Sequence, residues 1–218
     1  RVKLALEEAG RVAGMIQYLP VEESVVEGKG LYFIPCIWVH GYKNGIGDFQ
    51  GQGMGSALLN AAENDAKNMG AKGMAAWGSW LPFWMKASWF KKHGYKKADR
   101  DSMRLLVWKP FSDDASRPHW LHPQKTVATN PGRVTVTAFI NGWCPAQNLV
   151  FERAKRASAE FGDKVVFASI DTSDRAVFLE WGIGDGIFVD GKKISFGPPL
   201  SYDKIIKKIS KKVKSLPS

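Results

Sequence analysis

The sequence predicts an α/β (α+β) protein made of two successive domains, and three observations support this expectation. An apolar run over residues 31–40 indicates a strand, and a glycine-rich turn and a helix-forming segment follow it over 50–69. Several prolines then interrupt the chain without apolar periodicity, as is typical of a linker. After this stretch the pattern returns to strand, helix and strand. We therefore expect a first domain over 1–111, a linker over 112–132 and a second domain over 133–218.

The first domain is expected to alternate strands with one long helix. Alanine and leucine recur at helical spacing over 56–69 and predict a helix. The residues between the third strand and the glycine-rich turn, 40–49, are expected to form a loop beside a bound ligand. Apolar and β-branched residues predict strands at 2–6, 11–20, 31–40 and 73–78.

The glycine-rich turn over 50–56 predicts a site for an anion. Glycine lets the backbone approach a ligand closely, and the first N–H groups of the following helix have no partner inside the helix. A dinucleotide fingerprint would need a third glycine where Ser56 stands, and a P-loop would need a lysine, which is absent between Lys43 and Lys67. The pattern that remains is Q-x-x-G-x-G, from Gln50 to Gly55.

This pattern resembles the acetyl-CoA signature of the GNAT family of N-acetyltransferases. The run Trp89 to Tyr95 resembles the family's F-Y-x-K-x-G-F turn and lies in the expected order after the predicted strand at 73–78. The resemblance implies a mixed-sheet GNAT fold and direct transfer of acetyl from acetyl-CoA to a primary amine of a small molecule or peptide, in a ternary complex. It also implies that the strand and two helices that usually open such a domain are missing from this chain.

The resemblance further implies which residues hold the cosubstrate. Backbone groups of the strand should pair with the pantetheine arm, and the turn should hold the pyrophosphate. The family's tyrosine acid corresponds to Phe90, which has no hydroxyl, so the catalytic residues stay open; weak candidates are Cys36, Ser88 and Tyr95. The residues expected to bind acetyl-CoA are Ile37, Trp38, Val39, Gln50, Gly51, Gln52, Gly53, Met54, Gly55 and Ser56.

The second domain resembles a thioredoxin-type fold. The sequence Trp143-Cys144-Pro145 lies between a predicted strand and helix, where that superfamily carries its redox motif. The resolving position holds Gln147 rather than cysteine, so we expect no dithiol chemistry. Taken whole, the chain resembles the YoaP-like acetyltransferases, in which a GNAT domain precedes a small thioredoxin-like domain, and Pro82-Phe83 is a further residue pair that carries this likeness.

Composition limits the remaining function classes. Two cysteines supply neither a disulfide framework nor a four-ligand zinc site, and we expect no metal. The net charge of +10 comes largely from lysines between Lys204 and Lys214, which suit the solvated face of a terminal helix better than a nucleic-acid site. We expect a soluble, cytoplasmic protein without membrane contact. The alternative to an enzyme is a module that binds CoA or a partner without catalysis and carries a degenerate redox-like domain.

Overall fold

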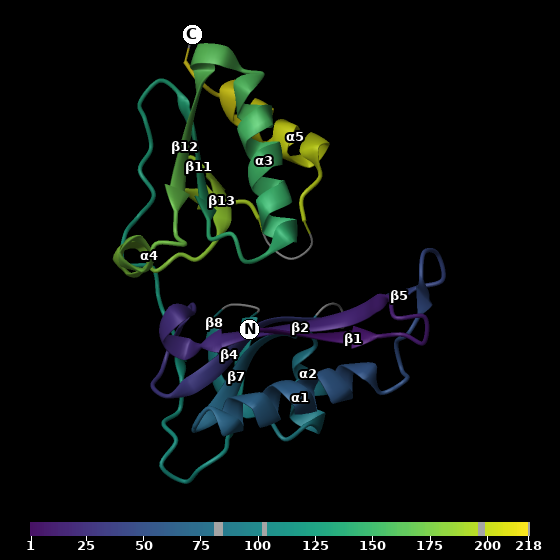
Figure 1. Ribbon diagram of the computed structural model, residues 1–218. Coiled ribbons are helices and arrows are strands. Elements are labelled where there is room, and N and C mark those ends of the chain that lie inside the picture. The colour runs from purple at the N-terminus through teal and green to yellow at the C-terminus, as the bar shows by residue number, and fades with distance from the viewer. Residues whose placement is uncertain (81–84, 102–103, 196–198, 218) are drawn as a thin grey trace. The chain divides into compact units, whose positions relative to one another are not determined.

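The computed structural model describes residues 1–80, 85–101, 104–195 and 199–217 of the 218-residue chain. The chain forms two compact units, Arg1–Leu121 and His122–Ser218 (Figure 1), and the division falls within 112–132. No helix in these ranges is both long and apolar enough to cross a bilayer.

The first unit is built on one mixed sheet, as the fold class predicted. Its strand order is β1-β2-β4-β7-β9-β8. The β4–β7 pair is parallel, and the other neighbouring strands run antiparallel. The strands are β1 (Val2–Leu6), β2 (Val12–Pro20), β4 (Leu31–Val39), β7 (Gly73–Ser79), β8 (Lys96–Asp101) and β9 (Arg104–Pro110).

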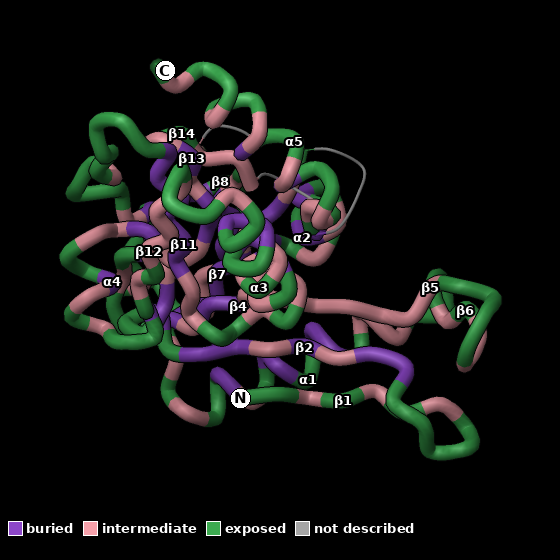
Figure 2. The backbone as a smooth tube through the Cα atoms, turned by 90° about the horizontal axis from the view of Figure 1, so that it is seen from above, coloured by how far each residue is buried: buried purple, intermediate pink, exposed green. Residues whose placement is uncertain are grey.

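Two helices, α1 (Met54–Asn68) and α2 (Ala87–Lys92), pack on one face of this sheet (Figure 1). The predicted helix over 56–69 is confirmed as α1, and Figure 2 shows the buried residues along β2 and β7 in the same unit. The opposite face is covered by η1 (Val21–Glu23) and by β3 (Val26–Glu27) paired with β10 (His119–Trp120). Burying aliphatic and aromatic side chains on both faces stabilises the sheet between them.

The segment over 40–49, expected to be a loop, contains a small hairpin instead. Strands β5 (Gly41–Tyr42) and β6 (Gly47–Asp48) pair antiparallel, and the hairpin projects from the end of the sheet (Figures 1 and 2). Gly45 and Gly47 have φ of 85° and 112°, which L-residues rarely adopt and which permit the tight reversal. The His40 ring nitrogen Nδ1 lies 2.6 Å from the Gly47 carbonyl oxygen and fixes the base of the hairpin.

The second unit contains the predicted strand, helix and parallel strand, here β11 (Val134–Ile140), α3 (Pro145–Ala159) and β12 (Val165–Asp171). Asp190 and Gly191 both have positive φ and form the tight turn between two antiparallel strands, as is typical of an Asp-Gly pair. Helix α4, which the sequence pattern did not indicate, is capped by the Asp174 carboxylate. The remaining elements are α4 (Arg175–Trp181), β13 (Gly186–Val189), β14 (Lys192–Lys193) and α5 (Tyr202–Val213).

Candidate functional site

Strands β4 and β7 diverge in the middle of the first sheet. They pair only from Leu31 to Ile34, opposite Gly73 to Ala76, whereas β7 stays paired with β9 as far as Ser79. Over the rest of β4 the pairing that the structure describes is with β2 alone. Among the described residues, Ile37 to Val39 therefore have no strand on the side opposite β2, where an extended ligand could pair.

A β-bulge at the same point changes which face the side chains of β4 occupy. The register with β2 passes from Leu19 opposite Phe33 to Gln17 opposite Cys36, which adds one residue to β4. Ile37 and Val39 consequently pack on the same side as the helices. Cys36 and Trp38 alternate with them and belong to the opposite face.

The glycine-rich turn ends in a helix N-terminus with free donors. Gly53 has φ of 83° and is the N-cap of α1, whose first backbone bond runs from Ala57 N–H to the Gly53 carbonyl. The N–H groups of the first turn, Met54 to Ser56, therefore have no acceptor within the helix. No acidic residue lies in that turn, so its partial positive charge is not offset there. This arrangement is an anion-binding geometry.

The glutamines of the turn hold its shape. Gln50 Nε2 donates to the Val39 carbonyl at 3.3 Å, and Gln52 Nε2 donates to the Asp48 carbonyl at 2.9 Å. A Cβ built on Gly41 would lie 2.3 Å from the Gln50 side chain, so that glycine leaves room for the glutamine. Backbone N–H groups, rather than these amide side chains, are left to face an anion.

Residues of α2 lie directly beside this turn. Ser56 Oγ is 2.9 Å from His93 Nε2, and His93 Nδ1 is 2.9 Å from the Trp89 carbonyl oxygen. The centroids of the Trp89 and His93 rings are 4.2 Å apart. A Cβ built on Gly55 would lie 3.5 Å from the Trp89 ring. The sequence placed His93 in the turn motif without giving it a role. Its contact with Ser56 joins two segments that are 37 residues apart.

The catalytic candidates are not gathered at one point. Cys36 lies half-buried on β4, and Ser88 is exposed on α2. Tyr95 is 3 % exposed. Its burial, and to a smaller extent the negative charge of Glu63, raise the pKa of Tyr95 well above the usual value. Phe90 is fully buried and packs edge-on against Tyr95. The Pro82-Phe83 pair lies outside the described residues.

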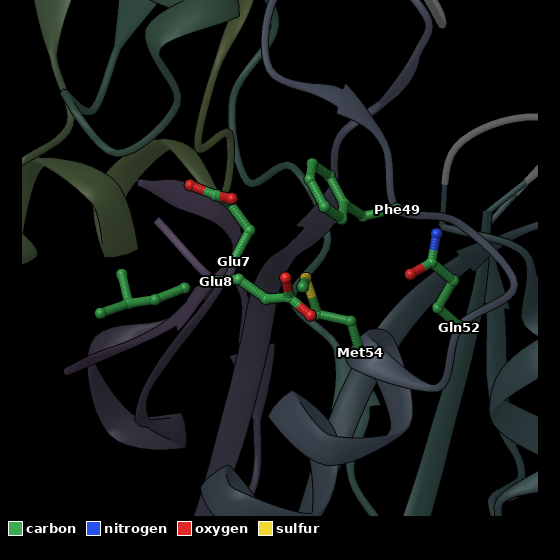
Figure 3. A pocket seen from close by; sticks show the side chains of 6 residues that line it. Glu7, Glu8, Phe49, Gln52 and Met54 are labelled. Carbon is green, nitrogen blue, oxygen red and sulfur yellow. The ribbon is translucent and has the colours of Figure 1, made fainter. Parts of the chain in front are cut away.

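A hollow of about 280 Å³ adjoins the turn (Figure 3). Glu7 lies at the wall of this hollow. The hydrogen bond from the Arg11 side chain, and to a smaller extent the one from the Ala9 backbone N–H, lower the pKa of the Glu7 carboxyl to about 2. A carboxylate at its wall disfavours a phosphate inside the hollow itself. Its lining residues are Leu6, Glu7, Glu8, Phe49, Gln52 and Met54.

In the second unit, Cys144 is the N-cap of α3 and its side chain makes no capping hydrogen bond. Gln147 follows it within the first turn of the helix, and neither residue is fully buried. None of the described peptide bonds is cis, including those before β13 near Asp185-Gly186, where a thioredoxin would carry its cis-proline. The placement of Cys144 between β11 and α3 agrees with the predicted order of elements.

Comparison with known proteins finds a family match within the first unit. Residues 3–97, less than half of the chain, match the family model described as an acetyltransferase (GNAT) domain. No protein of curated function matches the chain.

Similar solved structures include three acetyltransferases, and this chain covers less than two thirds of each. A GNAT family acetyltransferase from Brucella melitensis in complex with acetyl-CoA has 22% identity and a TM-score of 0.37, over 53% of this chain and 61% of that one. The CoA complex of the GNAT family N-acetyltransferase YhbS from Escherichia coli has 15% identity and a TM-score of 0.41, over 55% of this chain and 66% of that one. The CoA complex of the PaiA N-acetyltransferase from Thermoplasma acidophilum has 16% identity and a TM-score of 0.38, over 48% of this chain and 57% of that one.

The match over 3–97 spans the diverging β4–β7 pair, the turn that caps α1, and the turn after α2. The strand over 31–40, the glycine-rich turn and the run Trp89 to Tyr95, which carried the resemblance, thus all lie within the matched range. The first unit of this chain is therefore similar to a GNAT acetyltransferase domain over residues 3–97.

Proposed function

We propose that this chain transfers acetyl from acetyl-CoA to a primary amine, which attacks the thioester directly in a ternary complex. The observation that carries the proposal is the stretch of β4 from Ile37 to Val39, which has no second strand beside it among the described residues and leads to the N-terminus of α1. An extended ligand with an anionic end fits such a combination of strand edge and helix N-terminus.

In this proposal the pyrophosphate of CoA binds the N–H groups of Met54, Gly55 and Ser56. The pantetheine arm lies along β4 over Ile37 to Val39 and pairs with its backbone as an added strand would. The hydrogen bond from Gln50 to the Val39 carbonyl supports the proposal, because it fixes the anion-binding turn to the end of that strand.

The transfer makes one bond and breaks one. The amine nitrogen bonds to the thioester carbon, the C–S bond breaks, and CoA leaves as a thiolate, while the proton lost by the amine passes to a base or to water. With Phe90 fully buried and lacking a hydroxyl, we propose that water protonates the thiolate. A thiolate leaves readily, so the missing acid slows the reaction without preventing it.

Thiol release from acetyl-CoA, measured with a panel of small amines and N-terminal peptides, tests the activity. We expect release above the amine-free blank and an acetylated product of the corresponding mass. A calorimetric titration with acetyl-CoA on the same sample tests binding separately. Absence of both binding and release would contradict the proposal.

The second candidate is a CoA-binding module without catalysis. The specific observation in its favour is that Phe90 and Tyr95, the aromatic residues of the turn motif, are both buried in the core. Binding of acetyl-CoA without thiol release to any amine, in a full-length chain, would select this candidate.

For the second unit we propose a thioredoxin-like, YoaP-like domain without dithiol reductase activity. The order β11-α3-β12 with Cys144 at the helix start supports the fold, and Gln147 at the resolving position argues against the activity. We expect insulin disulfides to remain unreduced by the protein in the presence of a thiol donor. Reduction that is lost in Cys144→Ser would overturn this proposal. The protein as a whole is proposed to act in the cytoplasm.

A further inference from the structure

When the His93 imidazole is neutral, the Ser56 hydroxyl donates its hydrogen bond to that ring. The Trp89 carbonyl can only accept, so His93 Nδ1, 2.9 Å away, carries the ring hydrogen. Nε2 of a neutral ring is then an acceptor, and Ser56 must donate its single hydrogen to it across 2.9 Å. Ser56 Oγ therefore presents only lone pairs to a ligand at the N-terminus of α1.

Those lone pairs repel an anion at the position where the helix attracts one. To donate to a phosphate oxygen, Ser56 must turn its hydrogen away from His93 and leave the neutral Nε2 without a donor. If His93 takes up a proton, Nε2–H donates to Ser56 Oγ and the Ser56 hydrogen is released toward the ligand. The imidazolium then also adds a positive charge next to the anion.

The polar and charged groups near the ring come from its own helix, from α1 and from β9. The described hydrogen bonds of the ring involve Ser56 and Trp89 only. On its own helix, Lys91 and Lys92 oppose a second positive charge, whereas the C-terminus of α2, where His93 is the C-cap, favours one. Helix α1 has no charged residue before Glu63. Glu63 forms a 2.8 Å ion pair with Lys109 of β9. The Lys109 side chain lies next to Gly94.

We infer that His93 is a positioning residue that couples the binding of the CoA pyrophosphate to the uptake of one proton, by controlling the direction of the Ser56 hydroxyl. This inference rests on the proposed function, because it takes CoA as the anion. It predicts that CoA binds more tightly as the pH falls through the range in which histidine gains its proton.

Calorimetric titration of the full chain with 3′-dephospho-CoA tests this coupling, because that ligand lacks the phosphate monoester that itself titrates near neutral pH. Titrations at one pH in buffers of different ionisation enthalpy measure the protons taken up. We expect net proton uptake by the wild type near pH 7 and an affinity that rises more than about threefold between pH 8 and pH 6. His93→Gln, whose amide N–H can donate to Ser56 at any pH, and Ser56→Ala should both bind without this uptake.

His119→Gln is the matched control, because it removes an exposed histidine of the same unit. It should retain the uptake and the pH dependence of the wild type. Equal proton uptake in wild type, His93→Gln and Ser56→Ala would overturn the inference and leave the CoA site intact. No binding of dephospho-CoA or CoA by the wild type at any pH would instead contradict the proposed function.

Discussion

Trp77 Nε1 donates a 2.7 Å hydrogen bond to the Pro35 carbonyl, and this bond crosses the point where β4 and β7 diverge. The last paired residues, Ile34 and Ala76, immediately precede the two partners. Proline has no N–H to offer a neighbouring strand, so the backbone ladder cannot continue through Pro35 in the regular way. A side chain thus links the two strands immediately after their last paired residues, at the point where they diverge.

Trp77→Phe should destabilise the first unit and weaken acetyl-CoA binding. The variant keeps an aromatic ring but loses the bond to Pro35, and such a bond contributes about 0.5–1.5 kcal/mol, with a further loss from the smaller ring. Urea unfolding and calorimetry measure the two effects. The control is Trp120→Phe, since the buried Trp120 Nε1 has no acceptor among the described residues. Equal CoA affinity in both variants would mean that the Trp77 bond does not shape the site.

Gly53→Ala should lower CoA affinity, and Gly70→Ala should not. Both glycines have positive φ, 83° and 80°, and a Cβ on either would meet no atom within 4 Å, so the two variants carry similar backbone strain. Only Gly53 caps the N-terminus of α1, where the anion is proposed to bind. We expect a calorimetric loss of about tenfold, or about 1.4 kcal/mol, for Gly53→Ala alone. Matching affinities would place the anion elsewhere.

The parts of the fold that local chemistry specifies could be predicted from the sequence. Glycines with positive φ mark the turn before α1, and Asp190-Gly191 marks the reversal between β13 and β14, because each needs a backbone conformation that few residues adopt. Apolar runs likewise predicted β4 and β11. The acetyl-CoA residues remain predictions drawn from the resemblance.

The features that depend on distant segments could not be predicted in this way. The contact of Ser56 with His93, the pairing of β10 with β3 and the bulge in β4 each join segments that are far apart in the chain. The spacing of side chains within one segment does not reveal which distant segment lies beside it. The hairpin over 41–48 was missed because its strands are two residues long, too short for periodicity to reveal.

Phe90→Tyr should leave acetyl transfer unchanged or faster. The resemblance implies that Phe90 stands where the family carries its tyrosine acid, and general-acid help to a leaving group is typically worth about 10²–10⁴-fold where it operates. The new hydroxyl accelerates transfer only if it reaches the CoA sulfur from this fully buried position. Thiol release at saturating acetyl-CoA, with binding measured in parallel, gives the answer. A tenfold fall with unchanged CoA affinity would show that Phe90 does not stand at the acid's position.

Tyr95→Phe should remove part of the protein's sensitivity to alkali. Folding raises the pKa of Tyr95, mainly by burial, so the folded chain holds this proton more tightly than the unfolded chain. The resulting stabilisation is complete below about pH 10, where unfolded tyrosine stays protonated, and is lost as the pH rises from there toward the folded pKa.

Urea unfolding between pH 7 and pH 11 measures this effect. Because Tyr95 Oη makes no well-formed hydrogen bond to a described residue, we expect Tyr95→Phe to change stability at pH 7 by less than about 1 kcal/mol and to flatten its decline above pH 10. Tyr42→Phe, at an exposed tyrosine, is the control and should retain the wild-type decline. An unaltered decline in Tyr95→Phe would assign the alkaline sensitivity to other groups.

The bulge in β4 divides one strand into two stretches that should tolerate mutation differently. The Phe33 side chain is buried on one face of the sheet and the Ile34 side chain on the other. Selection for stability therefore restricts both positions. Beyond the bulge, Ile37 and Val39 pack against the core, and residues 36–39 are all only partly buried. Sequence variation should therefore be tolerated more readily beyond the bulge than before it, within a strand whose first half stays constant.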